Sequence, residues 1–175
     1  MANDEWVLVE RLAIAADATT KDFTTVLSGN TDLGYKIKAS IVRGTTTNAA
    51  TNYGLRVNGA SMAANRRYIS ASSTTVSTAA TAASILTLGL GTNANATLEG
   101  GMEYTLNYAR TGYERFWRFW GSRINSNTDW QEEFIGTLRM TTPNTATDIT
   151  SLGIVADQTG GIGANSILEL YKKGA

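Results

Sequence analysis

Apolar and polar residues alternate with a period of two along much of the chain. In YKIKASIV (35–42), apolar residues are separated by two lysines and a serine, which is the pattern of a half-buried strand. The segments 52–59 and 101–110 repeat this alternation. Because successive side chains of a strand point to opposite faces, the apolar set is predicted to face a core. The residues predicted to point inward are Tyr35, Ile37, Ile41, Leu55, Val57, Tyr104, Leu106, Leu168 and Leu170.

Further segments extend the strand pattern to most of the chain. The Asn58-Gly59 pair predicts a tight turn. Segment 71–84 is rich in Thr and Ser, which disfavour helix interiors, so we expect a polar connection there with a helical turn or an edge strand. About eight or nine short strands predict an all-β fold: one domain (1–175), a single antiparallel β-sandwich that is jelly-roll-like. The remaining predicted strands lie within 5–14, 84–90, 132–140, 148–156 and 166–173.

The segment ERFWRFWGSR (114–123) places two Trp and two Phe among three Arg. In an extended chain, Arg115, Trp117 and Phe119 share one face, and the residues between them share the other. Neither face is uniformly apolar or polar, so the pattern does not predict a strand with one face in a core and the other in water. Three interpretations are open: a platform that stacks sugars or bases, the wall of an active site, or a strand pressed against another protein.

This aromatic and basic segment is the main candidate for a binding surface. The competing interpretation is that the aromatic residues belong to the core, with the arginine stems lying over them. Interface centres are enriched in Arg and Trp, which favours a subunit contact over a free surface. The candidate interface or binding residues are Trp117, Trp120, Arg118, Arg115, Tyr113, Trp130 and Trp6.

The composition excludes several classes of chemistry. The chain has no His and no Cys, so triads with a histidine base, Cys/His zinc sites and disulfides are impossible. Lys plus Arg and Asp plus Glu number 15 each, so we expect neither nucleic acid nor an anionic membrane as a partner. Charged residues are 17%, against about 25% in ordinary soluble domains. Such a surface suits an assembly subunit.

Candidate catalytic and ligand-binding motifs are weak. The adjacent carboxylates Asp4-Glu5 and Glu132-Glu133 would point to opposite faces of a strand, which makes them poor catalytic pairs. The segment QTGGIGANS (158–166) lacks the lysine of a phosphate-binding loop and a following helix, so it predicts a Gly-rich β-turn. We therefore predict no catalytic residue, no metal site and no cofactor. No signal peptide or membrane-spanning segment is recognisable, and synthesis in a cytoplasm is expected.

The C-terminal segment DITSLGIVADQTGGIGANSILELYKK (148–173) resembles the ending shared by small structural proteins of tailed-bacteriophage virions. Segments 22–44 and 53–70 are also similar to that family, whereas the region around 70 to 130 is not covered. The matching C-terminal residues are Ile149, Thr150, Ser151, Ser166, Leu168, Leu170 and Tyr171, with Asn165 where the family has glycine.

The resemblance implies a non-enzymatic virion protein of β-sandwich type, made in the host cytoplasm. The expected role is a capsid decoration (cement) protein that binds across subunits of the major capsid protein, as a homotrimer. The alternative is a receptor- or glycan-binding module of a tail fibre or tip. The short chain, without a shaft segment, favours decoration.

The N-terminal segment MANDEWVLVE opens polar and becomes apolar on both alternating faces from Trp6 to Val9. Because the first residues of a domain stay ordered only when they are held by contacts, we predict that this segment pairs with a strand of its own domain. Residues 1–5 are predicted to form an arm that touches the capsid or a neighbouring subunit. A plain first strand with a frayed tip is the alternative.

Overall fold

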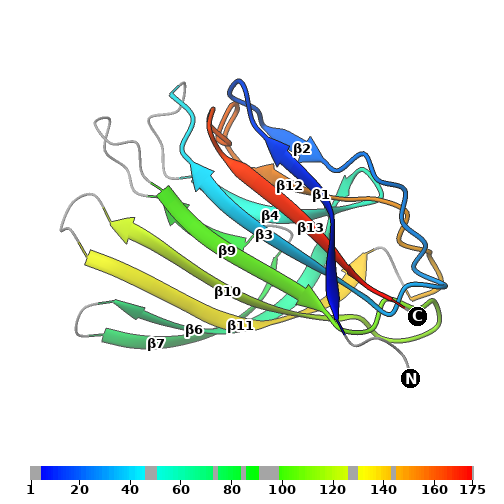
Figure 1. The fold of residues 1–175 in the computed structure, drawn as a ribbon. Coiled ribbons are helices and arrows are strands. Elements are labelled where there is room, and N and C mark those ends of the chain that lie inside the picture. The colour runs from blue at the N-terminus through cyan, green and yellow to red at the C-terminus, as the bar shows by residue number, and fades with distance from the viewer. Residues whose placement is uncertain are drawn as a thin grey trace.

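In a computed structural model, the chain forms two antiparallel sheets packed face to face (Figure 1). The structure describes residues 5–45, 51–72, 75–83, 86–90, 99–125, 130–142 and 145–174. The large sheet has the order β1 (Trp6–Ala13), β13 (Ile167–Lys173), β3 (Gly34–Val42), β9 (Glu99–Leu106), β10 (Phe116–Asn125), β11 (Trp130–Thr142), β6 (Ala63–Ser72) and β7 (Thr75–Ala83). The small sheet has the order β2 (Thr20–Asp22), β12 (Leu152–Ala156), β4 (Thr51–Val57) and β5 (Ala60–Ser61), and β8 (Leu86–Leu90) also pairs with β4.

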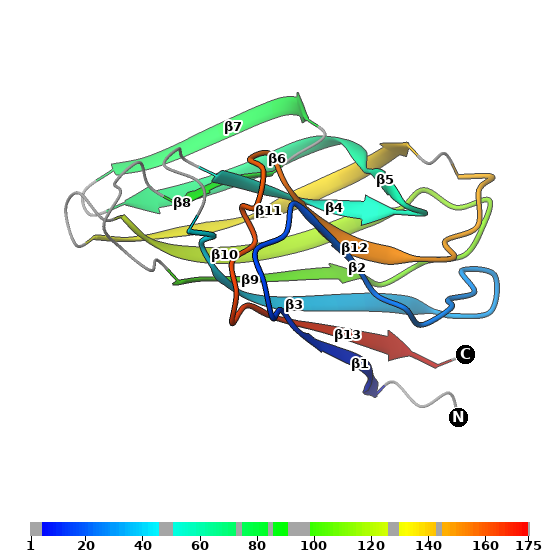
Figure 2. The ribbon, with the colours of Figure 1, turned by 90° about the horizontal axis from the view of Figure 1, so that it is seen from above.

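The predicted all-β sandwich is confirmed, and the described residues contain no helix. Figure 2 follows the large sheet from β7 to β1, with β4, β12 and β2 lying against it. Eight strands remain when β5, β6, β7, β10 and β11 are left out. Numbered 1 to 8 along the chain, they have the order 1-8-3-6 in the large sheet and 2-7-4-5 in the small sheet. Two Greek keys give this kind of order. Because five further strands belong to the sheets, the jelly-roll-like part of the prediction is not confirmed. The four strands β10, β11, β6 and β7 then extend one sheet.

The core lies between the two sheets and follows the period-two pattern. All nine residues predicted to point inward are buried. Along β3, for example, Tyr35, Ile37 and Ile41 are buried while Lys36 and Lys38 lie on the opposite side. The small sheet contributes Tyr53, Leu55, Val57, Leu152 and Ile154 to the same core.

Two strands in the middle of the chain differ from the sequence-based expectation. β6 was not predicted, because its AANRRYISAS sequence carries two adjacent arginines and little alternation. It forms because β11 and β7 pair with it on both sides. For segment 71–84, the edge-strand alternative is correct: β7 ends the sheet, and the helical turn is absent from its described residues. Its Thr and Val residues are β-branched, which suits a strand.

Two predicted turns have the expected backbone. Asn58 and Gly59 have φ values of 54° and 75° and connect β4 to β5. The Asn58 side chain also accepts a hydrogen bond from the Thr150 backbone N–H at 2.8 Å, which ties this turn to the loop before β12. In the Gly-rich segment, Gly160 and Asn165 have φ values of 69° and 71°, so this segment makes turns between β12 and β13. The β-turn interpretation is confirmed.

The first strand pairs with another strand of its own domain, as predicted, and that partner is β13. β1 runs antiparallel to β13 and forms one edge of the large sheet, with a bulge between Leu8 and Glu10. Two successive apolar residues of this edge stay in solvent, since Val7 is 56% exposed and Leu8 is 47% exposed. Of the predicted arm, Glu5 is exposed, and residues 1–4 lie outside the described part of the chain. The contact expected for the arm stays a prediction.

Candidate functional site

Strand β10 divides the aromatic and basic segment between the core and the solvent. Arg115, Trp117 and Phe119 are buried, with exposures of 1%, 0% and 3%, whereas Phe116 and Trp120 are 50% and 44% exposed. The expectation that this segment is not a strand with one face in a core and the other in water is therefore wrong, and the interpretation that its aromatic residues belong to the core holds for Trp117 and Phe119. The inward face accepts an arginine because Arg115 immediately precedes the strand, where backbone carbonyls are available.

Arg115 is a buried structural group. Its Nε donates a hydrogen bond to the carbonyl oxygen of Ala109 at 3.0 Å, which holds the 107–115 loop against β10. Burial lowers the pKa of the Arg115 guanidinium, while the charge of Asp148 and the Tyr35 hydroxyl act in the opposite direction. Arg115 and Trp117 thus stabilise the core of their own chain. Their assignment to a contact surface is wrong.

The other candidate residues occupy three places. Trp6, Arg118 and Trp120 lie on the outer face, the face of the large sheet turned away from the small sheet. Tyr113 lies in the loop before β10, where its ring contacts that of Tyr108 at 5.6 Å between centroids. The backbone of Trp130 begins β11, and its side chain lies outside the described residues.

A row of charged side chains crosses the outer face and ends at Trp120. The strand register places Trp120 opposite Glu103, Glu103 opposite Lys38, Lys38 opposite Glu169, and Glu169 opposite Arg11. Two ion pairs join this row: Lys38 Nζ lies 3.8 Å from Glu103 Oε2, and Arg11 Nε lies 3.6 Å from Glu169 Oε1. Positive and negative charges therefore alternate along it.

A second set of contacts orients the row. Lys36 Nζ lies 3.5 Å from Glu103 Oε1 and 4.9 Å above the centroid of the Trp6 ring. The Tyr171 hydroxyl donates a hydrogen bond to Glu169 Oε2 at 2.8 Å, and this bond raises the pKa of Tyr171. Glu103 is thus held by two lysines of β3, and Glu169 is held by Arg11 of β1 and by Tyr171 of its own strand.

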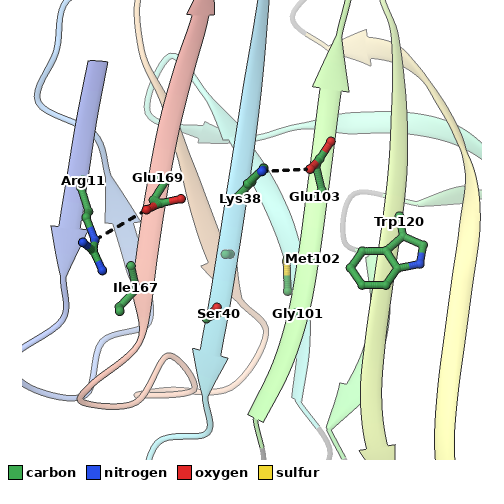
Figure 3. A pocket seen from close by; sticks show the side chains of 10 residues that line it. Arg11, Lys38, Ser40, Gly101, Met102, Glu103, Trp120, Ile167 and Glu169 are labelled. Atoms are coloured by element: carbon green, nitrogen blue, oxygen red, sulfur yellow. Dashed lines mark ion pairs between the residues drawn. The ribbon is translucent and has the colours of Figure 1, made fainter. Parts of the chain in front are cut away.

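Beside the charged row lies a groove with a volume of about 360 Å³ (Figure 3). This size falls within the range of about 300–1,000 Å³ for small-molecule sites. Its floor is low because the neighbouring row consists of Gly101, Ser40 and Ile167, of which glycine has no side chain and serine a short one. The Trp120 ring projects from β10 toward β9, over this floor. The lining residues are Arg11, Lys38, Ala39, Ser40, Gly101, Met102, Glu103, Trp120, Ile167 and Glu169.

The groove gathers carboxylates and cations on one face of the sheet. It brings Glu103 and Glu169 to the same side of the sheet, which the adjacent carboxylate pairs of the sequence could not do. Each carboxylate lies within 3.8 Å of a cation. They are therefore placed as hydrogen-bond acceptors.

Among the described residues, no three His, Cys, Asp or Glu side chains gather as metal ligands would. None of these residues forms a helix long and apolar enough to cross a lipid bilayer.

The sequence indicated one wall of the groove and missed the rest. Trp120 was a candidate, whereas Lys38 and Glu103 were interpreted only as polar positions of half-buried strands. Arg11 and Glu169 were not singled out. The signal in the sequence was a charged residue at an outward position of each of four strands. The order of the strands in the sheet was needed to show that these four residues are neighbours. Comparisons with protein-family models, curated proteins and solved structures found no match to this chain.

Proposed function

We propose that this chain is a structural protein of a tailed-phage virion that decorates the capsid, binding across subunits of the major capsid protein. The resemblance of segments 22–44, 53–70 and 148–173 to virion proteins supports this role, as does the low content of charged residues. The observation that carries the proposal is the apolar edge strand β1, where Val7 and Leu8 are both about half exposed. The protein is proposed to act without catalysis.

The position of Val7 and Leu8 favours a protein partner. They are successive residues of an edge strand, so their side chains point to opposite sides of the sheet. A partner that covers both must reach around the edge, and an edge strand also offers unpaired backbone groups for hydrogen bonds. The N-terminal residues precede this strand directly. The proposed attachment therefore combines β1 with the arm at 1–5.

A second apolar surface is proposed for self-association. Phe116 on β10 and Ile135 on β11 are 50% and 60% exposed on the outer face, and Ile135 lies opposite Trp120. Aromatic side chains are enriched at interface cores. A homotrimer would bury Phe116 and Ile135 at each contact between subunits. Arg118 lies between Phe116 and Trp120 on the same face, where it suits the polar rim of that contact.

The test is the heat resistance of capsids that carry the protein. Binding only to the closed shell stabilises it by about 2.7 kcal/mol per site at a hundredfold excess over the dissociation constant. Replacing Val7 and Leu8 by Thr keeps the β-propensity of the edge and should abolish binding. The matched control is Val26→Thr, because Val26 is 87% exposed and lies outside β1. Capsids that open at the same temperature with and without the wild-type protein would refute the proposal.

The alternative, a receptor- or glycan-binding tail module, is favoured by one observation, the groove beside Trp120. It predicts attachment to host cells. Particles lacking the protein would then lose adsorption while keeping their heat resistance, the reverse of the result expected for decoration. Measuring both quantities on the same particles separates the two roles.

A further inference from the structure

We propose that the groove on the outer face binds one pyranose unit of a neutral polysaccharide, stacked on Trp120 above Gly101. This inference goes beyond the proposed attachment to a capsid, because the groove does not include Val7 or Leu8. It takes only Arg11 from β1, and it lies on the side of Trp120 that is turned toward β9. The inference rests on three features of the groove: its aromatic wall, its open floor and its balanced charge.

The aromatic wall fits the flat face of a sugar ring. Trp120 is 44% exposed, and its Cζ3 atom would lie 3.9 Å from a Cβ atom built on Gly101. The indole therefore leans over a position that has no side chain, so a flat ligand can contact the ring and the floor together (Figure 3). A pyranose offers one face of C–H groups for such a contact, and the electron-rich face of an indole attracts them.

The charged wall fits the hydroxyl groups at the rim of the sugar. The Lys38–Glu103 and Arg11–Glu169 pairs are separated by 3.8 and 3.6 Å, longer than the 2.7–3.2 Å typical of a hydrogen bond. At such separations a water molecule commonly bridges two polar groups. A hydroxyl group both donates and accepts, so it can take the place of that bridging water between a cation and a carboxylate.

The balance of charge selects a neutral ligand. Arg11 and Lys38 contribute two positive charges to the lining, and Glu103 and Glu169 contribute two negative ones, so the sum is zero. A phosphate or sulfate group would meet a carboxylate beside each cation, and a basic peptide would meet a cation beside each carboxylate. A site of this kind offers donors and acceptors without a net field.

The experiment is a titration of the full chain, followed by NMR, with methyl glycosides of glucose, galactose and mannose and with methyl glucuronide as the charged probe. At least one neutral glycoside should bind with a dissociation constant of roughly 1 mM, and the glucuronide should bind more weakly. Absence of saturation by all three neutral glycosides up to roughly 50 mM would overturn the proposal. Tighter binding of the glucuronide would overturn it as well.

Two variants locate the site. Gly101→Val places a branched side chain on the floor, where the built Cβ meets only ordinary contacts at 3.7 and 3.9 Å, and it should weaken binding at least about tenfold. Trp120→Ala should weaken it similarly, whereas Val26→Ala, at an 87% exposed position outside the groove, should leave it unchanged. Full binding by either groove variant would overturn the proposal.

The heat resistance of capsids is measured in parallel with the wild-type protein and with Gly101→Val. If the wild-type protein binds a glycoside but does not stabilise capsids, only the proposed attachment is wrong. If capsids are stabilised and no glycoside binds, only the proposed groove ligand is wrong.

Discussion

Two tryptophans three residues apart on β10 should differ sharply in their contribution to stability. Trp117 is fully buried, and a buried aromatic side chain removes about 150–250 Å² from water. At about 25 cal/mol per Å², this area contributes about 4–6 kcal/mol, and measured Trp→Ala costs in cores are about 3–5 kcal/mol. Trp117→Ala is therefore expected to lower the free energy of unfolding by about 4 kcal/mol and Tm by about 10 °C.

Trp120→Ala is the matched comparison, because it makes the same change on the same strand. Nearly half of this side chain is already in water, and its removal leaves no closed cavity, so the expected loss is about 1–2 kcal/mol. Urea unfolding followed by far-ultraviolet circular dichroism gives both values without relying on tryptophan fluorescence. Equal losses for the two variants, or a larger loss for Trp120→Ala, would refute the assignment of the strand's two faces.

Three further predictions concern hydroxyl groups, pH and salt. The Tyr104 hydroxyl is buried without a hydrogen-bond partner among the described residues, so Tyr104→Phe should raise the free energy of unfolding by about 1 kcal/mol in urea titrations. Tyr35→Phe should lower the free energy of unfolding by about 2 kcal/mol, because the Tyr35 hydroxyl donates a hydrogen bond to Asp32 at 2.8 Å. A loss of stability in both variants would contradict this contrast. Burial alone would raise the pKa of Glu10, but hydrogen bonds from Thr24 and Thr25 outweigh it and lower the pKa. A lowered pKa gives a stabilisation that is present above the unfolded-state value of 4.5 and is lost as the pH falls below that value. Glu10→Gln should therefore be less stable than wild type at pH 7, and its stability should approach that of wild type in acid. A destabilisation that is the same at both pH values would contradict that origin. Finally, capsid attachment through apolar contacts should change little between about 0.05 and 0.5 M salt, and a steep loss of bound protein in sedimentation would indicate charged contacts instead.

The sequence by itself determined most of the strands and, where apolar and polar residues alternate, which side chains are inside, whereas β6 and the inward face of β10 escaped it. Alternation in 35–42 and 101–110 placed Tyr35 and Tyr104 in the core, because a strand has only two faces and burying the apolar face is favourable. Asn58-Gly59 determined a turn, since both residues tolerate the positive φ that the turn requires. These are local properties, so a single segment carries the information.

Only the tertiary structure decided how strands distant in sequence become neighbours. Arg11, Glu169, Lys38, Glu103 and Trp120 come from five strands, and the sheet order alone aligns them into one row beside the groove. The same holds for Arg115, whose burial depends on the carbonyl of Ala109 at the end of the sandwich. Pairing between strands uses backbone groups that every residue carries, so the order of the strands is set by the packing of the whole chain, and so is the place where their outward side chains meet.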